Sequence, residues 1–309
     1  MPLHHETPLL HSVALSARVQ APVWLKLESA QPSASFKLRG MGLAAERAVA
    51  RGATRLVSSS GGNAGYAVAW AGRALGVPVT VVVPSTTGAR MRGLIEATGA
   101  EVQIAGDVWD EAHAAATTLA EQTGGALLHP FDHPDIWTGH ASLIAEVAQA
   151  GLTPTQVVVS VGGGGLLAGV LQGMDAAGWS EVPVLAIETH GAESFSAALA
   201  ADRPVTLPAI TSLALTLGSK RVCDQVFAQA KTHPVQSIVV SDASAVQACA
   251  QFLDDHRVLV EPSCGAALSV VYDQHPAVMH TAGSILVIVC GGAGVTRTQL
   301  DDWLAATRT

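Results

Sequence analysis

The sequence has few charges and no long apolar run, and each of these features narrows the range of functions. Only 14% of the 309 residues are charged, the formal net charge is -8, and lysines and arginines form no cluster. This argues against a surface that binds nucleic acid or an anionic membrane. The apolar runs are too short to span a bilayer. The first residues lack the basic and apolar segments of a signal peptide, so we expect a cytoplasmic protein.

Cysteine is also scarce, and its spacing excludes two common kinds of site. The four cysteines are Cys223, Cys249, Cys264 and Cys290, and no two are spaced as Cys-x-x-Cys. The sequence therefore predicts neither a zinc knuckle nor a dithiol redox motif. The twelve histidines include no His-Glu-x-x-His pattern, and we expect no transition-metal site. Free thiols fit a reducing compartment.

Short β-branched runs alternate with alanine-rich amphipathic stretches along the whole chain. Several of the runs are apolar throughout, which is typical of parallel strands buried on both faces. Repetition of strand, helix and strand predicts an α/β fold. The predicted strands are Val23–Leu27, Arg55–Ser58, Val79–Val83, Glu101–Ile104, Val157–Ser160, Val184–Ile187, Ser237–Val240 and Ile285–Val289. The predicted helices are Lys37–Arg51, Asn63–Leu75, Ala89–Thr98, Asp107–Thr123, Trp137–Ala150, Leu166–Ala177, Ala192–Ala201, Lys220–Lys231, Ala243–Asp255, Cys264–Tyr272 and Thr298–Ala306. The turn-rich stretch His129–Pro134 is the predicted boundary between two lobes.

Lys37 is the residue best suited to covalent chemistry. It sits between Phe36 and Leu38, after the small polar residues Ser33 and Ser35. Partial burial disfavours the ammonium form of a lysine and frees its amine to attack a carbonyl. The alternative is a lysine at a helix start whose stem lies along apolar surface, which is common for a lysine on its own.

Four consecutive glycines, Gly162, Gly163, Gly164 and Gly165, follow a predicted strand and precede a predicted helix. Ligands of open parallel sheets bind at the carboxyl ends of the strands. A glycine loop lets backbone N–H groups approach an anion, and the helix N-terminus adds partial positive charge. We therefore expect a phosphate group here. The loop matches neither the P-loop nor the spaced dinucleotide fingerprint. A tight strand-to-helix turn is the structural alternative.

Two further segments lie at predicted strand ends. Ser58–Gly65 combines small polar residues with a helix start near Asn63, and its hydroxyl and N–H groups are suited to a carboxylate. Simple N-capping by Ser60 or Asn63 is compatible with that role. Cys290 ends an apolar strand, where a cysteine either packs or offers a weak hydrogen bond to a flat cofactor. A phosphate loop and a reactive lysine without a nucleotide fingerprint suggest pyridoxal 5'-phosphate, with Lys37 as its Schiff-base partner.

Together the motifs resemble one family of enzymes. They are Ser33–Gly40 (Ser-Ala-Ser-Phe-Lys-Leu-Arg-Gly), Ser58–Gly65, the four glycines and Cys290-Gly291-Gly292, with further matches at Val83–Thr87, Ile136–Ser142, Glu188–Phe195 and Val260–Ala267. The pattern resembles the fold-type II (tryptophan synthase β-like) pyridoxal phosphate enzymes. Within them it is most similar to the L-serine dehydratase/L-threonine deaminase family in its short catabolic form. The resemblance runs through nearly the whole chain and implies a two-lobed fold, each lobe with a mostly parallel sheet flanked by helices.

The resemblance assigns a role to each matching position. Lys37 is the cofactor lysine, Phe36 stacks near the cofactor ring, and Asn63 binds the ring 3'-oxygen. The remaining roles fall to the carboxylate loop (Ser60, Gly61, Asn63), the phosphate loop (Gly162, Gly163, Gly164, Gly165) and the residue facing the pyridine nitrogen (Cys290). A monovalent-cation site is implied at Gly162, Glu188, Ala192, Ser194, Leu217 and Ser219, and hard oxygen ligands around one carboxylate suit potassium. The alternative for Glu188 is that it only caps the helix after it.

The resemblance also implies lobes and partners. Residues 36–132 form a small lobe with the carboxylate loop, and residues 1–35 and 133–309 form a large lobe with the phosphate loop and cation site. A homodimer acting on a small amino acid is expected, without nucleic acid or membrane.

The implied reaction is β-elimination. L-serine gives pyruvate and ammonia, and L-threonine gives 2-oxobutanoate and ammonia. One departure is Gly61, where the liver-type pattern has alanine, and it bears on specificity and rate. Alternatives within the fold type are serine racemase, threonine synthase and cysteine synthase. A different class is a non-catalytic phosphate-binding protein, which would lack the visible absorbance of a lysine-bound cofactor.

Overall fold

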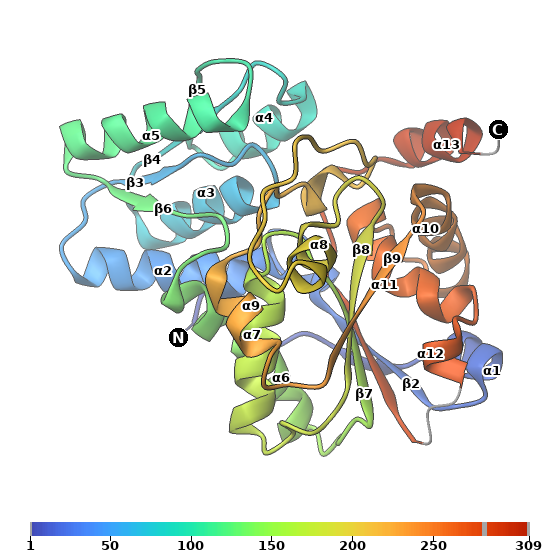
Figure 1. Cartoon of the computed structure of the whole chain (residues 1–309). Helices are drawn as coiled ribbons and strands as arrows, with labels where there is room; N and C mark the ends of the chain where they lie inside the picture. The colour runs from blue at the N-terminus through green and yellow to red at the C-terminus, as the bar shows by residue number, and fades with distance from the viewer. Residues whose placement is uncertain (1, 280–282, 308–309) are drawn as a thin grey trace. The chain divides into compact units, whose positions relative to one another are not determined.

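The computed structural model describes residues 2–279 and 283–307, and Figure 1 labels its helices and strands. The chain forms two compact units. Unit 1 comprises Met1–His5 and Gln31–His140, and unit 2 comprises Glu6–Ala30 and Ala141–Thr309. Both units are α/β, as the sequence predicts. The division differs from the predicted lobes, since the segment that ends at His5 and residues 31–35 and 133–140 also fall in unit 1. The assignment of functions to the two lobes stays a prediction.

Unit 1 is built on a four-stranded parallel sheet with the order β5-β4-β3-β6. Its strands are β3 (Leu56–Ser58), β4 (Val79–Val83), β5 (Glu101–Ile104) and β6 (Ala126–Leu128). Its helices are α2 (Lys37–Ala50), α3 (Asn63–Leu75), α4 (Ala89–Glu96) and α5 (Trp109–Thr123). The first part of α6 (Pro134–Gln149) completes it.

Alternate side chains of the unit 1 strands reach opposite faces of the sheet, and each face has its own core. Leu56 and Val81 pack in the cluster that contains α2 and α3 residues. Val57 and Val82 pack instead with Ala112, Ala116 and Ala120 of α5. Because successive strand residues point to opposite sides, a short apolar strand needs helices on both faces. Figure 1 shows α5 on one side of these strands and α2 and α3 on the other.

Unit 2 contains a six-stranded sheet with the order β1-β2-β10-β7-β8-β9, in which only β1 is antiparallel. Its strands are β1 (Leu9–His11), β2 (Val23–Leu27), β7 (Gln156–Ser160), β8 (Val184–Thr189), β9 (Val235–Val240) and β10 (Ile285–Val289). Its helices are α1 (Val13–Val19), α7 (Gly165–Ala176), α8 (Ser194–Ala200), α9 (Asp224–Gln229), α10 (Asp242–His256), α11 (Pro262–Tyr272), α12 (Pro276–Met279) and α13 (Arg297–Ala306). Short 3-10 helices lie at Glu28–Ala30 and Leu215–Leu217.

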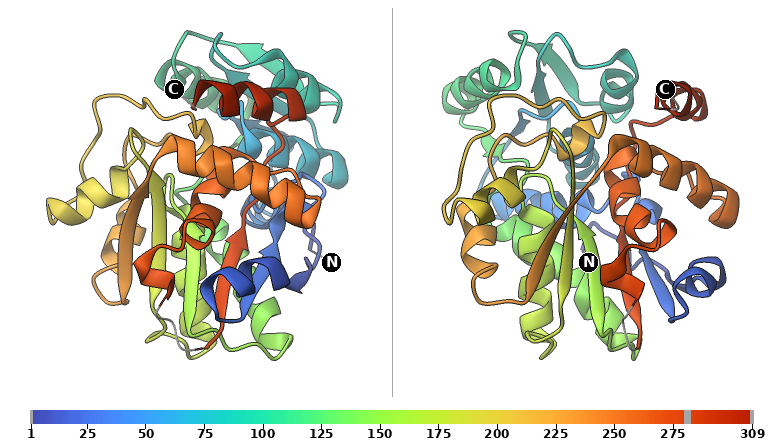
Figure 2. Two further views of the ribbon diagram at one scale, coloured as in Figure 1. Left: turned by 90° about the vertical axis from the view of Figure 1, so that its right-hand side faces the viewer. Right: turned by 45° about the vertical axis from the view of Figure 1, so that its right-hand side comes forward.

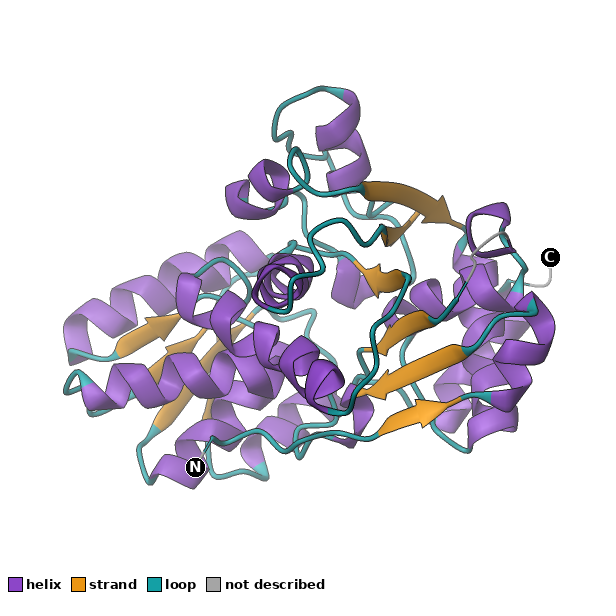
Figure 3. Cartoon of the chain, turned by 90° about the horizontal axis from the view of Figure 1, so that it is seen from below, coloured by secondary structure: helices purple, strands orange, loops and turns teal. Residues whose placement is uncertain are grey.

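The core of unit 2 forms around its central strands. Every residue of β7, β8 and β10 is buried, which is the pattern predicted for parallel strands covered on both faces. All of α11 is buried, and it packs against β7, β8 and β10 on one side and α10 on the other. Figure 2 shows the orange helices α10 and α11 beside this sheet. Figure 3 shows helices beside the strands of each sheet.

The structure adds elements that the sequence analysis did not predict, namely α1, β1, β6 and α12. The helix α6 begins at Pro134, earlier than the predicted Trp137, because proline is well tolerated in the first turn of a helix. The division between the units falls inside α6, between His140 and Ala141, and not in the stretch His129–Pro134. No helix among the described residues has the length and apolarity needed to cross a membrane.

Candidate active site

Lys37 is the first residue of α2 and is half-buried. Its Nζ donates a hydrogen bond to the backbone carbonyl of Pro130 at 2.7 Å and lies 5.1 Å from the centre of the Phe36 ring. The hydroxyls of Ser33 and Ser35 are buried and have no hydrogen-bond partner in the described part of the chain. The segment Ser33–Lys37 therefore presents an amine, an aromatic ring and two buried hydroxyl groups that have no partner among the described residues.

The start of α2 is held against α6 by two glycines. A methyl group added at Gly40 would lie 2.6 Å from the His140 ring, and one added at Gly139 would lie 2.3 Å from the Arg39 carbonyl oxygen. Such contacts are too close for any side chain, so glycine permits the approach of the two backbones. The His140 ring then lies 4.9 Å from the Phe36 ring. Burial, with smaller effects of Lys37 and Arg39, holds the pKa of His140 well below its usual value, so the imidazole is neutral.

The segment Ser58–Gly65 forms a loop between β3 and α3 that is held by side chains. The Ser60 hydroxyl accepts the Gly62 N–H at 3.3 Å. The hydroxyl of Ser59, which is fully buried, lies 2.9 Å from Nδ1 of His113 on α5. Asn63 begins α3 and is 8% exposed. Residues Ser60 and Gly61 are partly exposed, so the loop keeps hydroxyl and backbone groups accessible at the start of a 13-residue helix.

Gly61 faces Thr87, which follows β4. A methyl group added at Gly61 would lie 2.6 Å from both Cγ2 and Oγ1 of Thr87. Since β3 and β4 are paired in parallel, the loops after them meet at one edge of the sheet. The structure thus gives a local reason for the glycine at the position where the resemblance expects alanine.

The four glycines of unit 2 link β7 to α7. Gly164 has φ +89°, and a methyl group there would lie 2.4 Å from Val226. A methyl group at Gly162 would lie 3.1 Å from the backbone of Leu217. Gly162 and Gly163 remain partly exposed. The first backbone N–H groups of a helix have no partner within the helix, so this loop is suited to receive an anion.

Cys290 directly follows β10 and is 6% exposed. Its thiol is hydrogen-bonded to Cys264 of α11. That bond, together with burial, raises the pKa of the Cys290 thiol well above its usual value, so the group is neutral at physiological pH. Glu261 lies beside Cys290. The Glu261 carboxylate accepts hydrogen bonds from the Thr216 hydroxyl at 2.9 Å and from the Gly294 N–H at 2.7 Å.

Glu188 is in β8, next to β7 in the sheet. Its two carboxylate oxygens accept the N–H groups of Phe195 and Ser196 at 2.8 and 2.7 Å, so it does cap α8. Burial raises the pKa of Glu188 to about 7.

The Ser194 hydroxyl is buried and has no hydrogen-bond partner in the described residues. Ala192 is fully buried, and the Ser219 N–H donates to the Leu217 carbonyl at 2.7 Å. Parallel pairing of β10, β7 and β8 thus brings Cys290, the glycine loop and Glu188 to one edge of the unit 2 sheet.

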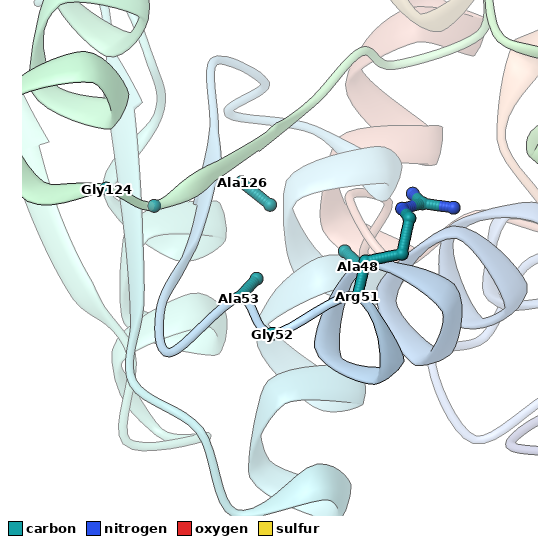
Figure 4. A pocket seen from close by; sticks show the side chains of 7 residues that line it. Ala48, Arg51, Gly52, Ala53, Gly124 and Ala126 are labelled. Carbon is teal, nitrogen blue, oxygen red and sulfur yellow. The ribbon is translucent and has the colours of Figure 1, made fainter.

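A hollow of about 310 Å³ lies elsewhere on unit 1 (Figure 4). It is lined by Ala48, Arg51, Gly52, Ala53, Gly124, Gly125 and Ala126. These residues come from the end of α2 and from the segments that enter β3 and β6. The hollow therefore lies at the amino ends of the strands, opposite the edge that carries Ser60 and Gly61, and contains no predicted site residue.

One known protein family matches nearly the whole chain. The model of the family "Pyridoxal-phosphate dependent enzyme" matches residues 1–291. The chain belongs to this family. It is 49% identical over 309 residues to "Serine dehydratase-like" of Mus musculus, covering 97% of this chain and 94% of that protein. It is 46% identical to "L-serine dehydratase/L-threonine deaminase" of Homo sapiens, with coverage of 97% and 94%. The structure superposes on a fungal L-serine ammonia-lyase from Rhizomucor miehei with a TM-score of 0.92, 37% identity and 98% coverage of each chain.

Family membership and fold class, as predicted from the sequence, are confirmed. Pyridoxal phosphate is the cofactor of the family, and the residues present fit it. Lys37 supplies an amine next to an aromatic ring, and the buried hydroxyls of Ser33 and Ser35, without a partner among the described residues, precede it in sequence. Buried polar groups in native proteins nearly always have partners, so the hydroxyls of Ser33 and Ser35 fit a polar group bound close to them. The glycine loop fits the phosphate.

Sequence reasoning missed the residues that hold the predicted site residues in place. Thr87, His113 and Cys264 contact Gly61, Ser59 and Cys290 respectively. His129 was assigned only to a turn-rich boundary. None of these has a local pattern that marks it. The one available signal is topological, because each of Thr87 and His129 follows a strand that pairs with β3.

Proposed function

We propose that this pyridoxal-phosphate dependent enzyme is an ammonia-lyase that converts L-serine to pyruvate and ammonia, and L-threonine to 2-oxobutanoate and ammonia. The observation that carries the proposal is the half-buried Lys37 amine at the start of α2, in the same unit as the carboxylate loop Ser58–Gly65. Relatives at 46% and 49% identity carry the names of this activity. An amino-acid catabolic role follows from the reaction.

Lys37 has two tasks in this reaction. The cofactor supplies an aldehyde that captures amines and a conjugated ring that accepts the electrons released at Cα. With the cofactor bound, the Lys37 amine would anchor it and would act as the base that removes the α-proton of the substrate. The α-proton and the β-hydroxyl group together leave as one molecule of water, and the released enamine hydrolyses to the oxo acid and ammonia.

The loop Ser60, Gly61 and Asn63 binds the substrate carboxylate. The loop offers the Ser60 hydroxyl, backbone N–H groups and the N-terminus of α3, all of which favour an anion. Asn63, which is buried, would also donate to the ring 3'-oxygen of the cofactor. Phe36 would pack beside the ring.

The residues proposed for the phosphate and the pyridine nitrogen of the cofactor belong to unit 2. Gly162, Gly163, Gly164 and Gly165 bind the phosphate through backbone N–H groups. Cys290 offers a neutral thiol to the pyridine nitrogen. A neutral thiol does not protonate that nitrogen strongly, which favours elimination over transamination.

We also propose a potassium site formed by Glu188 and Ser194, with backbone oxygens of Gly162, Ala192, Leu217 and Ser219. A buried carboxylate with a raised pKa gains from a cation that replaces its lost hydration. Activity in potassium should exceed that in sodium or Tris buffer, and Glu188→Gln should remove the difference. Equal rates in the three buffers would argue that Glu188 only caps α8.

Lys37→Ala tests the central assignment. The variant should lose turnover and the visible absorbance of the lysine-bound cofactor together, because one amine serves as anchor and base. Elimination at the wild-type rate would refute it. Steady-state rates on L-serine, L-threonine and D-serine separate the lyase from the alternative, a serine racemase or threonine synthase. A racemase interconverts the serine enantiomers, and it needs a proton donor on the opposite face, where Gly61 has no side chain.

Location and assembly follow from the same proposal. The cytoplasm provides the amino-acid substrate and the reducing conditions that suit four buried thiols. A homodimer is the expected assembly, and the molar mass measured by static light scattering tests it.

A further inference from the structure

The turn that follows β6 is organised by one imidazole. Nδ1 of His129 accepts the backbone N–H of Asp132 at 2.8 Å and that of Phe131 at 3.3 Å. Pro130 lies inside this turn and has no N–H, so its carbonyl is its only backbone hydrogen-bonding group. That carbonyl accepts the Lys37 amine at 2.7 Å. The far side of the turn is fixed by Trp137, whose Nε1 donates to the Phe131 carbonyl at 2.9 Å.

These bonds require a neutral His129. A backbone N–H only donates, so Nδ1 must keep its lone pair and the proton must lie on Nε2. The surroundings favour that form, since burial, followed by the charges of His113, Lys37 and His133, lowers the pKa of His129 to about 4. The ring is also fixed sterically, with its centre 4.7 Å from that of Phe131 and 5.9 Å from that of His113, both edge-on.

We propose that His129 is a positioning residue for Lys37, acting by fixing the Pro130 carbonyl as the hydrogen-bond acceptor of the lysine amine. The inference rests on the proposed role of Lys37 as anchor and base. It adds a residue that no motif of the family assigned, together with a chain of contacts that lies wholly within unit 1: His129 to the turn, the turn to Pro130, and Pro130 to Lys37.

A carbonyl is a suitable partner for an amine that must give and receive protons. It accepts a hydrogen bond from the ammonium and from the neutral amine alike, and it leaves the lone pair of the neutral amine available. An acceptor that fixes direction therefore places that lone pair for attack on the cofactor aldehyde and for removal of the α-proton. Loss of the geometry should slow both steps, while the substrate carboxylate loop keeps its own contacts.

The chain offers a close set of variants. In His129→Asn the side-chain oxygen takes the place of Nδ1 and accepts N–H groups two and three residues ahead, as asparagine does in turns. In His129→Leu this acceptor is lost. His133→Leu is the matched control, because Nδ1 of His133 accepts the Asp135 N–H at 3.1 Å in the next turn but holds no carbonyl bonded to Lys37.

Three measurements on the full-length protein test the proposal. Hydrogen exchange reports the amides of Phe131 and Asp132. Stopped-flow absorbance reports how fast the cofactor-stripped protein captures pyridoxal phosphate on Lys37. Steady-state kinetics with L-serine and with α-deuterated L-serine report proton removal. In His129→Leu we expect faster exchange of the two amides. Cofactor capture and kcat should each be about 10- to 100-fold slower. The isotope effect should be larger, and KM should be unchanged. His129→Asn should restore all of these, and His133→Leu should leave capture at the wild-type rate.

Several outcomes would overturn the proposal. Normal capture and kcat in His129→Leu, despite faster amide exchange, would show that the turn does not position the amine. An equal loss in His133→Leu would show a general structural effect. Should His129→Leu fail to fold, His129→Gln replaces it, because its longer side chain displaces the acceptor. Failure of the proposed function is distinguishable, since Lys37→Ala would then retain capture and turnover whatever residue 129 is.

Discussion

The loop Ser58–Gly65 in unit 1 and the glycine loop in unit 2 occupy equivalent places, each between a buried parallel strand and a helix. The first is held by side chains, including the Ser60 hydroxyl bond to Gly62 and the contact of Ser59 with His113. The second has no side chains of its own, and it packs its backbone against Leu217 and Val226. The difference matches the ligands proposed for them. A substrate that enters and leaves at every turnover meets adjustable hydroxyl groups, whereas a resident phosphate meets a fixed backbone.

The largest effect should come from a substitution that crowds the backbone of the unit 1 loop Ser58–Gly65. A methyl group at Gly65, in α3, would lie 1.7 Å from the Ser60 carbonyl oxygen. Gly65→Ala must displace the loop, so we expect a loss of about 3 kcal/mol in unfolding free energy, together with a rise in KM for L-serine. Gly93→Ala in α4 is the control, because nothing lies within 4 Å of the new methyl group. It should stabilise the protein by roughly 0.5–1 kcal/mol. Similar denaturation midpoints for the two variants would contradict the crowding.

The unit 2 loop should respond to Gly164→Ala. The substitution combines a left-handed backbone, which costs about 1–2 kcal/mol for a residue with a Cβ, with a contact of 2.4 Å to Val226. Thermal unfolding and fluorescence titration of pyridoxal phosphate should show lower stability and weaker cofactor binding. Gly178→Ala has a similar φ of +75° but open space around it, so it isolates the backbone cost. Cofactor binding in Gly178→Ala should stay normal, and a loss there equal to that of Gly164→Ala would argue against a packed phosphate loop.

A smaller effect should follow from adding one methyl group to the substrate side. Gly61→Ala places it 2.6 Å from Cγ2 and Oγ1 of Thr87, both at the end of a half-buried side chain. We expect kcat/KM for L-serine to fall by roughly 10-fold, which corresponds to about 1.4 kcal/mol. Thr87→Ala removes the two nearest atoms, so the double variant should recover most of the activity. No recovery would mean that the glycine matters for a reason other than Thr87.

The last prediction concerns a pH response, because the turn proposed to position Lys37 contains a titratable ring, that of His129. The pKa of His129 falls from 6.5 to about 4 on folding. As pH falls from 6.5 towards 4, the unfolded chain takes up a proton that the folded chain does not, so His129 lowers the unfolding free energy over this range and adds nothing further below it. Denaturant unfolding at pH 7, 5.5 and 4.5 should show a flatter dependence in His129→Asn. Parallel curves for the variant and wild type would rule this out.

The sequence predicts well what depends on local pattern. The runs Val23–Leu27, Val79–Val83 and Ile285–Val289 appear as strands with the predicted bounds, because apolar β-branched residues have few alternatives when both faces are covered. β6 was missed because Ala126–Leu128 has no β-branched residue and becomes a strand only through pairing with β3. β1 was missed because it is a partly exposed, three-residue strand at the edge of the sheet.

The residues of the candidate site also fall into those with a local sequence pattern and those without one. Lys37, Asn63 and the four glycines were predicted because their motifs are contiguous in sequence. His129 and Thr87 were not, since their contacts with the turn and with Gly61 arise only when separate strands meet at one edge of a sheet. No spacing in the sequence records that the carbonyl of Pro130, 93 residues after Lys37, accepts the lysine amine.

The distribution of cysteine has a practical consequence. All four thiols are buried, and all belong to unit 2, between Cys223 and Cys290. A thiol reagent therefore reacts only as fast as unit 2 opens, since buried groups exchange or react through local or global unfolding. Labelling kinetics read by mass spectrometry would act as a clock for the opening of unit 2 while unit 1 stays silent. The protein carries this reporter without any added probe.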